Sequence, residues 1–393
     1  MPELERYLTR VIPQDALTKK KMAFISGPRQ VGKSTVARQL IQSPQNYFLY
    51  DEEEFRRSWT KSPTQAISSR GHGPVVLDEI HKDRKWKIHL KGIVDPVAGK
   101  IPIIVTGSAR FDVYRRGSDS LLGRYLPYRL HPFSVAEDTN PIPPDEVFSR
   151  DQRRFDWDSL LTLGGFPEPL LSGSEQEAQR WSRLRLDRIV LEDTRDFLNI
   201  SDLQAFRSLI ALLPERVGSL LSINSLREEV GKAYGTVRSW MQVLDTLYYC
   251  FTIRPYSKRI SRAVRAEPKF YLYDILRIPK PLTSKRLENL AALHLLKLCH
   301  FWADTAQGDF ELYFLRNKDG REVDFFILRD QRPWMLVESK SSEKDPSKDL
   351  IHFKNVLKAP WAIQLVEDKG YDRFHAAHGI RVVYYEGFFA SLL

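Results

Sequence analysis

The stretch KMAFISGPRQVGKSTVARQL, residues 21–40, decides the fold of the N-terminal part of the chain. Five residues typical of a β-strand, MAFIS, precede a glycine-bearing loop, and residues with helical spacing follow it. The loop fits the pattern GxxxxGK[ST] in its required setting between a strand and a helix. The stretch therefore predicts an α/β domain whose first loop binds phosphate.

Each part of this loop has a role in binding a nucleotide. Glycines let backbone N–H groups curl around phosphate oxygens, and the amino end of the following helix adds positive potential. Lys33 would reach the β- and γ-phosphates, while the Ser34 hydroxyl would ligate Mg²⁺. We therefore expect ATP and Mg²⁺ as cofactors, and a nucleotide-binding set formed by Gly27, Gln30, Gly32, Lys33, Ser34 and Thr35.

A second apolar stretch, GPVVLDEIH at residues 73–81, ends in two acids. Its three consecutive apolar residues predict a buried strand, and α/β sheets place ligand groups at the carboxyl ends of such strands. Asp78 would hold Mg²⁺ through water, and Glu79 would polarise the attacking water, which makes this a hydrolase. The alternative, two acids that merely favour a helix start, loses weight beside a phosphate-binding loop.

A third buried strand, IPIIVTG at residues 101–107, leads into Ser108, which we expect to orient the attacking water. Downstream, Arg124 follows a glycine just before another predicted strand. An arginine so placed could reach the γ-phosphate of a neighbouring subunit, which requires a homo-oligomer, for example a hexamer. Surface solvation is the alternative for Arg124, and three other arginines compete for the same role: Arg110, Arg115 and Arg116.

Five motifs in order, GPRQVGKST, LDEIH, VTGSAR, LLGRYLPYRLHPFS and LGGFPE, extend this pattern through residue 168. The series resembles the prokaryotic AAA+ superfamily ATPases that carry a C-terminal domain of unknown function, and the resemblance covers essentially the whole chain. It implies a P-loop AAA+ core at residues 1–136 and a helical lid at 137–202. It also implies that Pro167 lies against the adenine base, although a simple Gly-Pro turn is the alternative.

Residues 203–268 have the pattern of a small helical domain that ends in a hairpin. FRSLIALLPERVG predicts an amphipathic helix; NSLREEV and TVRSWMQVLDTLYY predict two more, capped at Asn224 and opened at Thr236. The short glycine-bearing turn between the last two is typical of motifs that place the second helix in the major groove. The strand-like YYCFTIRPY and a basic run stand where a wing would be, so we predict a winged helix.

The charge distribution favours DNA as the partner of this winged helix. The chain carries a net charge of +10, and the run RPYSKRISRAVR at residues 254–265 holds five basic residues and no acidic one. We expect Tyr234, Thr236, Arg238 and Ser239 to face DNA, and Lys258, Arg259 and Arg262 to contact phosphates. Winged helices also serve as protein-interaction modules, and that alternative stays open.

The stretch GREVDFFILRDQRPWMLVESK, residues 320–340, places carboxylates within two short apolar strands. Desolvating such charges is costly unless they are paired or bind a metal. A helix at residues 286–300, the strands ELYFLRN, EVDFFIL and MLVESK, the helical DPSKDLIHFKNVL and a last strand WAIQLV surround them. This order, with an acid in the second strand and Glu-x-Lys in the third, resembles the PD-(D/E)XK nuclease superfamily and implies a nuclease-like domain at residues 269–393.

By that resemblance Asp324 and Glu338 hold a Mg²⁺ ion, joined by Glu288 from the helix. Lys340 would orient the attacking water or steady the developing phosphorane charge. Glu322 lies two positions from Asp324 on the same face of the strand and could share the role. The alternative is a catalytically idle fold whose acids pair with nearby basic residues, Lys340, Arg321 or Arg316.

The remaining composition bounds the class of protein. The longest apolar stretches fall short of the 18 residues that a membrane span needs, and the N-terminus lacks the pattern of a signal peptide. Two cysteines without metal-type spacing indicate a reducing compartment. We expect a cytoplasmic ATPase, free of membranes, that remodels or translocates on DNA, branched DNA included. The alternative is an ATP-controlled switch whose C-terminal domains only bind partners.

Overall fold

The computed structural model describes residues 4–68, 73–97, 101–107, 121, 123–137, 140–191, 194, 202–257 and 266–392. These residues form two compact units. Unit 1 comprises Met1–His131 and Asp138–Pro141, and unit 2 comprises Pro132–Glu137 and Ile142–Leu393. The regions expected to form a lid, a winged helix and a nuclease-like domain therefore belong to one unit.

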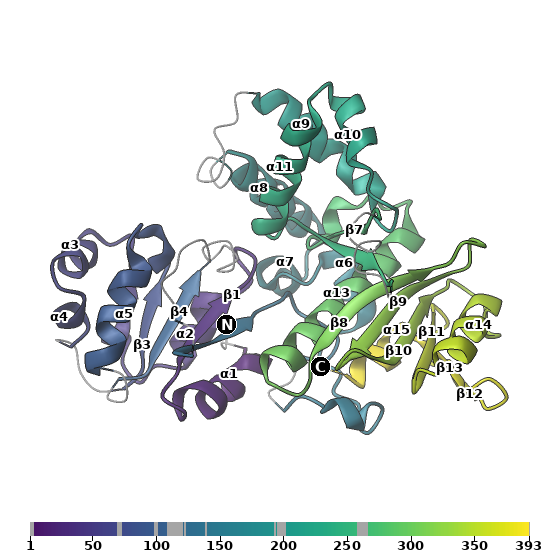
Figure 1. Ribbon diagram of the computed structural model, residues 1–393, viewed down its shortest axis with the longest axis horizontal. Helices are drawn as coiled ribbons and strands as arrows, with labels where there is room; N and C mark the ends of the chain where they lie inside the picture. Colours follow the sequence, from purple (N-terminus) through teal and green to yellow (C-terminus); the bar gives the residue numbers. More distant parts are fainter. Residues whose placement is uncertain are drawn as a thin grey trace. The chain divides into compact units, whose positions relative to one another are not determined.

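Unit 1 is built on a parallel sheet of five strands, in the order β2-β3-β4-β1-β5 (Figure 1). The strands are β1 (Met22–Ser26), β2 (Tyr47–Leu49), β3 (Val75–Asp78), β4 (Ile103–Gly107) and β5 (Tyr125–Arg129). Because all five run in the same direction, their carboxyl ends meet along one edge of the sheet. The phosphate-binding loop after β1 and the acids after β3 therefore reach the same edge.

The helices of unit 1 are α1 (Tyr7–Ile12), α2 (Lys33–Gln39), α3 (Glu53–Lys61), α4 (Pro63–Ser68) and α5 (Trp86–Val97), with a π-helical turn at Pro13–Leu17 and 3-10 turns at Pro44–Asn46 and Ile80–Lys82. Alternate residues of a strand point to opposite faces of a sheet. On one face Phe24, Leu77 and Val105 pack with Trp59 of α3 and Trp86 of α5. This core holds the strand ends in fixed positions.

The strand β4 lies between β1 and β3, which determines which side chains meet at the edge. Its Ile104 pairs with Ala23 of β1 and Val76 of β3, and Thr106 stands directly opposite Asp78. At the other side of β1, Tyr125 of β5 pairs with Met22. The sheet therefore places Thr106 beside the acid of β3, and the start of β5 beside the start of β1.

Unit 2 begins with two groups of helices. The first group consists of a 3-10 turn (Pro144–Glu146), α6 (Trp157–Leu163), α7 (Pro167–Ser172) and α8 (Glu175–Leu191). The second consists of α9 (Leu203–Leu212), a 3-10 turn (Leu213–Arg216), α10 (Ile223–Val230) and α11 (Tyr234–Thr246). The buried faces of α9 and α11 meet through an edge-on contact between the rings of Phe206 and Trp240, whose centroids are 5.4 Å apart.

Two helix starts in the second group differ from the sequence prediction. Ser222, and not Asn224, is the N-cap of α10, because the helix begins at Ile223 and Asn224 is its second residue. The Asn224 side chain accepts a hydrogen bond from Nε of Arg227 at 3.1 Å. The helix α11 begins at Tyr234, two residues before the predicted Thr236, since Ala233 in an extended conformation caps it. Both shifts are small, and the helix-turn-helix order remains.

A mixed sheet of eight strands forms the rest of unit 2, in the order β12-β13-β11-β10-β9-β8-β6-β7. The strands are β6 (Cys250–Pro255), β7 (Lys269–Leu272), β8 (Phe310–Arg316), β9 (Glu322–Arg329), β10 (Arg332–Ser339), β11 (Trp361–Val366), β12 (Asp372–His375) and β13 (Ile380–Tyr384). The parallel pairing of β6 with β8 joins the hairpin β6-β7 to the strands beyond residue 310. This continuity across the expected domain boundary was not predicted.

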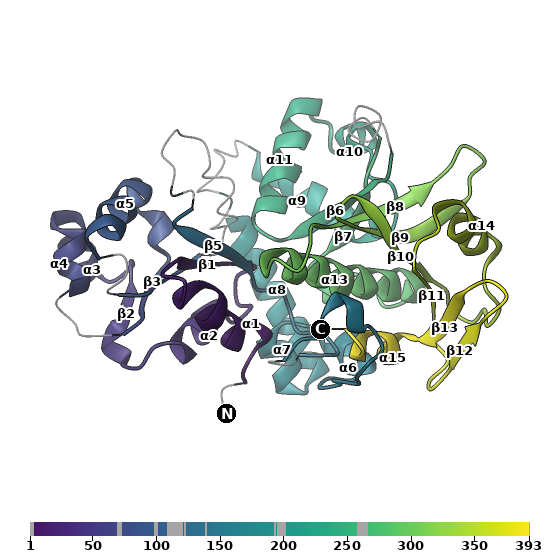
Figure 2. The same cartoon turned by 60° about the horizontal axis from the view of Figure 1, so that its bottom comes forward.

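Helices cover both faces of this sheet: α13 (Thr283–Asp304) on one face and α14 (Lys348–Leu357) on the other, with a 3-10 turn (Ile275–Arg277) before α13 and α15 (Tyr385–Ala390) at the end. Figure 2 shows α13 running along the sheet. Beneath α14, Phe353 packs with Phe326 and Leu336 in the core. WAIQLV was expected to be the last strand, but β12 and β13 follow it and extend the edge.

Candidate functional site

The phosphate-binding loop of unit 1 has a backbone that few sequences could adopt. Gly32 is the N-cap of α2 with φ 98°, and Gln30 also has a positive φ, 61°. A Cβ built at Gly27 would collide with the carbonyl oxygen of Leu130. Glycine is therefore required at Gly27, because a side chain there would push β1 and the start of the loop away from the segment after β5.

Lys33 is the first residue of α2, and its side chain turns back into the loop. Its Nζ donates hydrogen bonds to the carbonyl oxygens of Gly27 at 3.0 Å and Pro28 at 2.7 Å. The residue is 6% exposed, so its charge lies inside the loop and not in bulk water. This is the location in which an ammonium group can neutralise bound phosphate oxygens. Thr35, two residues on, is exposed on α2.

Ser34 and Asp78 lie in direct contact at the edge of the sheet. The Ser34 hydroxyl donates to Oδ2 of Asp78 at 2.8 Å, and the hydroxyls of Tyr47 and Thr106 also donate to this carboxylate. Burial and the neighbouring Asp78 raise the pKa of Tyr47 to about 12, so the phenol stays protonated and keeps donating. Hard cations such as Mg²⁺ bind oxygen ligands of this kind. The pair therefore fits a Mg²⁺ ion shared with nucleotide phosphates.

Glu79 stands at the end of β3 in a left-handed conformation, with φ 56°. Burial raises the pKa of Glu79 above its usual value, and the charge of Lys33 opposes that rise. His81 Nε2 lies 3.5 Å from Oε2 of Glu79. Burial, together with Lys82 and Lys33, lowers the pKa of His81 to about 4, so the imidazole is neutral near pH 7. A buried carboxylate beside a neutral imidazole is suited to accept a proton from water.

The predicted arginine finger lies far from the phosphate-binding loop of its own chain. Arg124 comes just before β5, and its carbonyl oxygen accepts a hydrogen bond from the Met22 N–H at 3.0 Å. Met22 begins β1 and Ser26 ends it, a rise of about 13 Å along the strand. Arg124 thus cannot act on its own nucleotide and could act only on that of another subunit. Ser108, Arg110, Arg115 and Arg116 lie outside the described residues.

The GGFP segment of unit 2 has a packing role that is visible in the structure. A Cβ at Gly165 would come within 2.7 Å of the Phe133 carbonyl oxygen. Phe166 is buried beneath the guanidinium of Arg185, which lies 4.4 Å from the ring centroid. Pro167 is the first residue of α7. The glycine and the phenylalanine are thus explained by packing, and a contact of Pro167 with adenine stays a prediction.

The helix α11 presents one polar face. Its buried residues include Val237, Trp240 and Leu244. Tyr234, Thr236 and Arg238 are exposed, with Tyr234 at 45%, and Ser239 is half-buried. All four residues predicted to face DNA therefore lie away from the core of the helical group. The predicted phosphate contacts Lys258, Arg259 and Arg262 fall outside the described residues.

The carboxylates of unit 2 converge on a lysine that was not predicted. Nζ of Lys269 lies 2.6 Å from Glu322, 2.9 Å from Asp324 and 3.2 Å from Glu288. The lysine side chain is only 4% exposed. Burial alone would lower the pKa of Lys269, but the three carboxylates outweigh that effect and raise it above the usual value. The ammonium group is therefore charged.

Glu288 is the most confined acid of this cluster. Its Oε1 accepts a hydrogen bond from the Tyr271 hydroxyl at 2.7 Å, and a Cβ built at Gly218 would lie 2.9 Å from Oε2. Burial and the charge of Asp324 raise the pKa of Glu288 to about 7, against the opposing charge of Lys269. Oε1 of Glu288 thus has protein partners, and Oε2 lies so close to Gly218 that a larger residue would not fit there.

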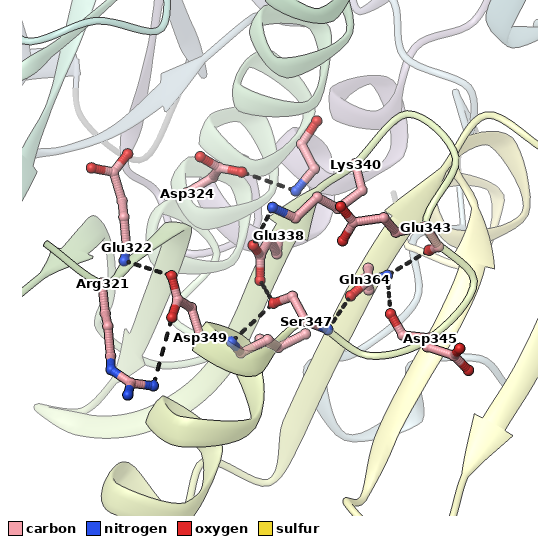
Figure 3. A network of polar contacts seen from close by, with 12 residues as sticks. Arg321, Glu322, Asp324, Glu338, Lys340, Glu343, Asp345, Ser347, Asp349 and Gln364 are labelled. Carbon is pink, nitrogen blue, oxygen red and sulfur yellow. Dashed lines mark hydrogen bonds and ion pairs between the residues drawn. The ribbon is translucent and has the colours of Figure 1, made fainter.

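Glu338 belongs to a neighbouring network, drawn in Figure 3. Lys340 Nζ lies 3.0 Å from its Oε1, and the Ser347 hydroxyl donates to its other oxygen. Burial raises the pKa of Glu338, with Ser347 and Lys340 opposing. Asp324 accepts a hydrogen bond from the Ser339 N–H at 3.0 Å. Lys340, the residue after β10, is therefore paired with Glu338, an acid of that strand.

The arrangement in unit 2 does not fit a Mg²⁺ ion. A divalent cation would have to bind between carboxylates that already surround an ammonium group, and like charges at contact distance repel strongly. Within the described ranges, no cluster of three or more His, Cys, Asp or Glu side chains is placed to hold a metal ion. We therefore derive no catalytic step from a metal at Glu288, Asp324 and Glu338.

Sequence reasoning missed five residues of these two sites: Tyr47, His81, Thr106, Lys269 and Tyr271. Thr106 and His81 lay inside quoted motifs, and the register of β4 against β3 places Thr106 opposite Asp78. Tyr47 comes from β2 and reaches Asp78 across 31 positions of sequence. Lys269 and Tyr271 lie two residues apart on β7, a strand to which the sequence prediction assigned no site residue.

The parallel sheet, the loop and the acids after β3 define unit 1 as a P-loop nucleotide-binding domain. Residues 19–138 match the family described as an AAA domain, which supports a P-loop AAA-type ATPase domain in this part of the chain. Residues 154–275 match a domain of unknown function, DUF8612, and residues 284–388 match another, DUF4143.

Curated relatives extend over most of the chain. An uncharacterized protein of Mycobacterium tuberculosis, Rv2008c, is 23% identical over 348 residues, which are 84% of this chain and 75% of the relative. An uncharacterized protein of Haemophilus influenzae is 22% identical over 395 residues, 92% of each chain. Both similarities are too low to transfer an activity.

One solved structure, AMPPCP-bound DnaA from Aquifex aeolicus, aligns with 61% of this chain and 86% of its own length at 12% identity. Its TM-score of 0.31 is too low to carry an argument. Among the helices of the described residues, none is long and apolar enough to cross a bilayer.

Proposed function

We propose that this chain is a DNA-binding ATPase that hydrolyses ATP to remodel or translocate on DNA, branched DNA included. The observation that carries the proposal is the convergence of Lys33, the Ser34–Asp78 pair and Glu79 at one edge of the sheet of unit 1. A loop that binds phosphate needs the first two features, and hydrolysis needs the third. The acid is therefore what separates an ATPase from a nucleotide-binding module.

In this proposal Lys33 binds the β- and γ-phosphate oxygens, and Ser34 and Asp78 hold Mg²⁺. A Mg²⁺ ion held by these residues would supply positive charge against the negative charge that develops on the phosphate oxygens. Glu79 accepts a proton from the attacking water, and the neutral His81 beside it adds no competing positive charge. Three hydroxyls that donate to Asp78 fix its orientation. In the proposed site Ser108 orients the attacking water, and Pro167 lies against the adenine base.

The proposed DNA-binding module spans residues 203–268. Support comes from the helices α9, α10 and α11, followed by β6 and its pairing with β7 just beyond residue 268, which is the order of a winged helix. The hairpin also bridges to Val217 and Leu220, ahead of α10, as a third short strand would. The exposed face of α11 carries Tyr234, Thr236 and Arg238. These features would place α11 against bases and the basic run against phosphates.

The proposal extends to the two flanking regions. Residues 137–202, which contain α6, α7 and α8, would form the lid, and residues 269–393 would form a nuclease-like domain that grips DNA. Support for the second assignment is the order of α13, β8, β9, β10, α14 and β11, with acids on β9 and β10. An ATPase of this kind would work as a homo-oligomer, because its arginine finger acts on a neighbouring subunit.

One observation favours a second candidate, an ATP-controlled switch that only docks partners. The acids of the nuclease-like region are already paired, Asp324 with Lys269 and Glu338 with Lys340. A domain without free catalytic acids is suited to binding rather than to cleavage. The two candidates differ in whether DNA changes the rate of ATP turnover.

DNA affinity should fall steeply with salt, and the basic run should carry part of that dependence. Each phosphate contact made by a lysine or arginine releases counterions from DNA. Replacing Lys258, Arg259 and Arg262 together by glutamine should therefore reduce the slope of log K against log salt by about 3 units. Fluorescence anisotropy with labelled duplex DNA at several salt concentrations measures the slope directly.

The matched control is the triple replacement of Arg56, Arg57 and Lys61 by glutamine, three exposed basic residues of α3. It removes the same formal charge and should leave the slope unchanged. An unchanged slope in the Lys258, Arg259 and Arg262 variant would place the DNA-binding surface elsewhere on the chain.

A further inference from the structure

The three carboxylates on β9 and α13 share one positively charged partner. Glu322 and Asp324 are on β9, Glu288 is on α13, and Nζ of Lys269 lies within 3.2 Å of an oxygen of each. These acids come from the positions at which a nuclease-like domain would gather ligands for a divalent cation. The ammonium group stands between them, as a bound cation would.

One lysine cannot neutralise three carboxylates, and other contacts offset the remaining negative charge. Arg316 lies 3.7 Å from Glu322, the Ser339 N–H donates to Asp324 at 3.0 Å, and the Tyr271 hydroxyl donates to Glu288. Charged groups that are removed from water need such partners at close range. Each acid of the cluster thus has a second protein partner, with Lys269 at the centre.

The position of Lys269 follows from the sheet rather than from a flexible loop. It is the first residue of β7, where Lys269 pairs with Ile253 of β6 and bridges to Leu220. Tyr271, two residues on, projects to the same face of β7 and reaches the same cluster. Two side chains of the hairpin β6-β7 therefore insert between acids of β9 and α13.

We propose that Lys269 is a built-in substitute for a divalent cation, so that the carboxylate cluster of unit 2 is stable without metal. Mg²⁺ requires oxygen ligands at 2.0–2.1 Å in octahedral geometry. Such a geometry cannot form while an ammonium group is in contact with the same oxygens. The consequence is that Lys269 joins β7, the partner strand of β6 in the proposed winged helix, to β9 and α13 by charge. These acids then cleave no phosphodiester bond.

The first test uses the wild-type chain without nucleotide, so that the P-loop site contributes no Mg²⁺ effect. Its melting temperature should be the same within about 1 °C in EDTA, in Mg²⁺ and in Mn²⁺, because a cation that does not bind the folded state cannot stabilise it. A rise in Mg²⁺ or Mn²⁺ that disappears in Asp324→Asn would overturn the proposal. This result would leave the ATPase proposal untouched, since that site lies in unit 1.

The second test replaces Lys269 by methionine, which keeps the length of the side chain and removes its charge. Three carboxylates would then face each other without a cation, so the melting temperature in EDTA should fall by roughly 10 °C. Mn²⁺ at millimolar concentration should restore several degrees of that loss by binding the vacated position. Lys318→Met, at an exposed residue, is the control and should melt like the wild type in every buffer.

Each outcome for Lys269→Met decides the proposal. An unchanged melting temperature would mean that Lys269 does not hold the acids together. A fall that no divalent cation reverses would mean that Lys269 does not stand where a cation could bind, and this too would overturn the proposal. If the variant does not fold, the wild-type comparison in EDTA, Mg²⁺ and Mn²⁺ decides alone.

Discussion

Glu79→Gln should abolish nearly all ATP turnover while leaving ATP affinity close to that of the wild type. The amide keeps the shape of the side chain and its contact distance to His81, but it cannot accept a proton from water. Loss of a positioned general base costs about 10²- to 10⁴-fold in rate. Steady-state phosphate release measures the rate, and fluorescence titration with a labelled nucleotide measures the affinity.

Glu52→Gln is a suitable control, because Glu52 is exposed at the start of α3 and its side chain makes no capping hydrogen bond. It should hydrolyse ATP at the wild-type rate. In contrast, Lys33→Ala should lose nucleotide binding itself, since Lys33 supplies charge to phosphate before any chemistry takes place. ATP hydrolysis by Glu79→Gln at the wild-type rate would show that another residue activates the water.

Arg124→Ala should lower ATP turnover by about 10³-fold or more while ATP affinity stays nearly intact. An arginine that stabilises charge only in the transition state contributes to the rate and little to ground-state binding. Because Arg124 precedes β5 at the amino end of β1, it cannot serve the loop of its own chain. The effect therefore requires a partner subunit. Arg56→Ala, at an exposed arginine of α3, is the control.

Mixing subunits separates this role from a structural one. Arg124→Ala and Lys33→Ala are each inactive alone, but a mixed interface pairs an intact loop with an intact finger. Some turnover should return on mixing, in proportion to the number of such interfaces. Sedimentation that shows a strict monomer at working concentration, with and without ATP and DNA, would exclude the mechanism. Full activity in Arg124→Ala would mean that Arg124 is not the arginine finger, and the remaining candidates would be Arg110, Arg115 and Arg116.

The nucleotide site could be predicted largely from sequence because its chemistry is local. Gly27, Lys33 and Ser34 all lie within one loop of eight residues, so the motif identifies them together. A short apolar run identifies the strand that ends at Asp78. Tyr47 could not be found in this way, since its approach to Asp78 depends on β2 lying beside β3 in the sheet. The same holds for Thr106, whose position follows from the register of β4.

The carboxylate cluster shows the limit of motif reasoning. Spacing along β9 correctly placed Glu322 and Asp324 on one face, and both reach Lys269. The partner itself could not be predicted, because Lys269 begins β7, 55 positions before Asp324 in the sequence. Only the parallel pairing of β6 with β8 brings that strand into the same sheet. The resemblance to nucleases predicted the acids, but it did not predict that Lys269 pairs with them.

The rate of ATP hydrolysis by the wild-type chain, measured in Mg²⁺ with and without DNA, tests the central claim most directly. Single-stranded, duplex and four-way junction DNA should be compared at equal nucleotide concentration and low salt, where phosphate contacts are strongest. An ATPase that acts on DNA should turn over ATP faster with at least one of these forms, and Lys33→Ala should show no turnover with any. Slow turnover that is the same with and without every DNA form would contradict the account and support the ATP-controlled switch.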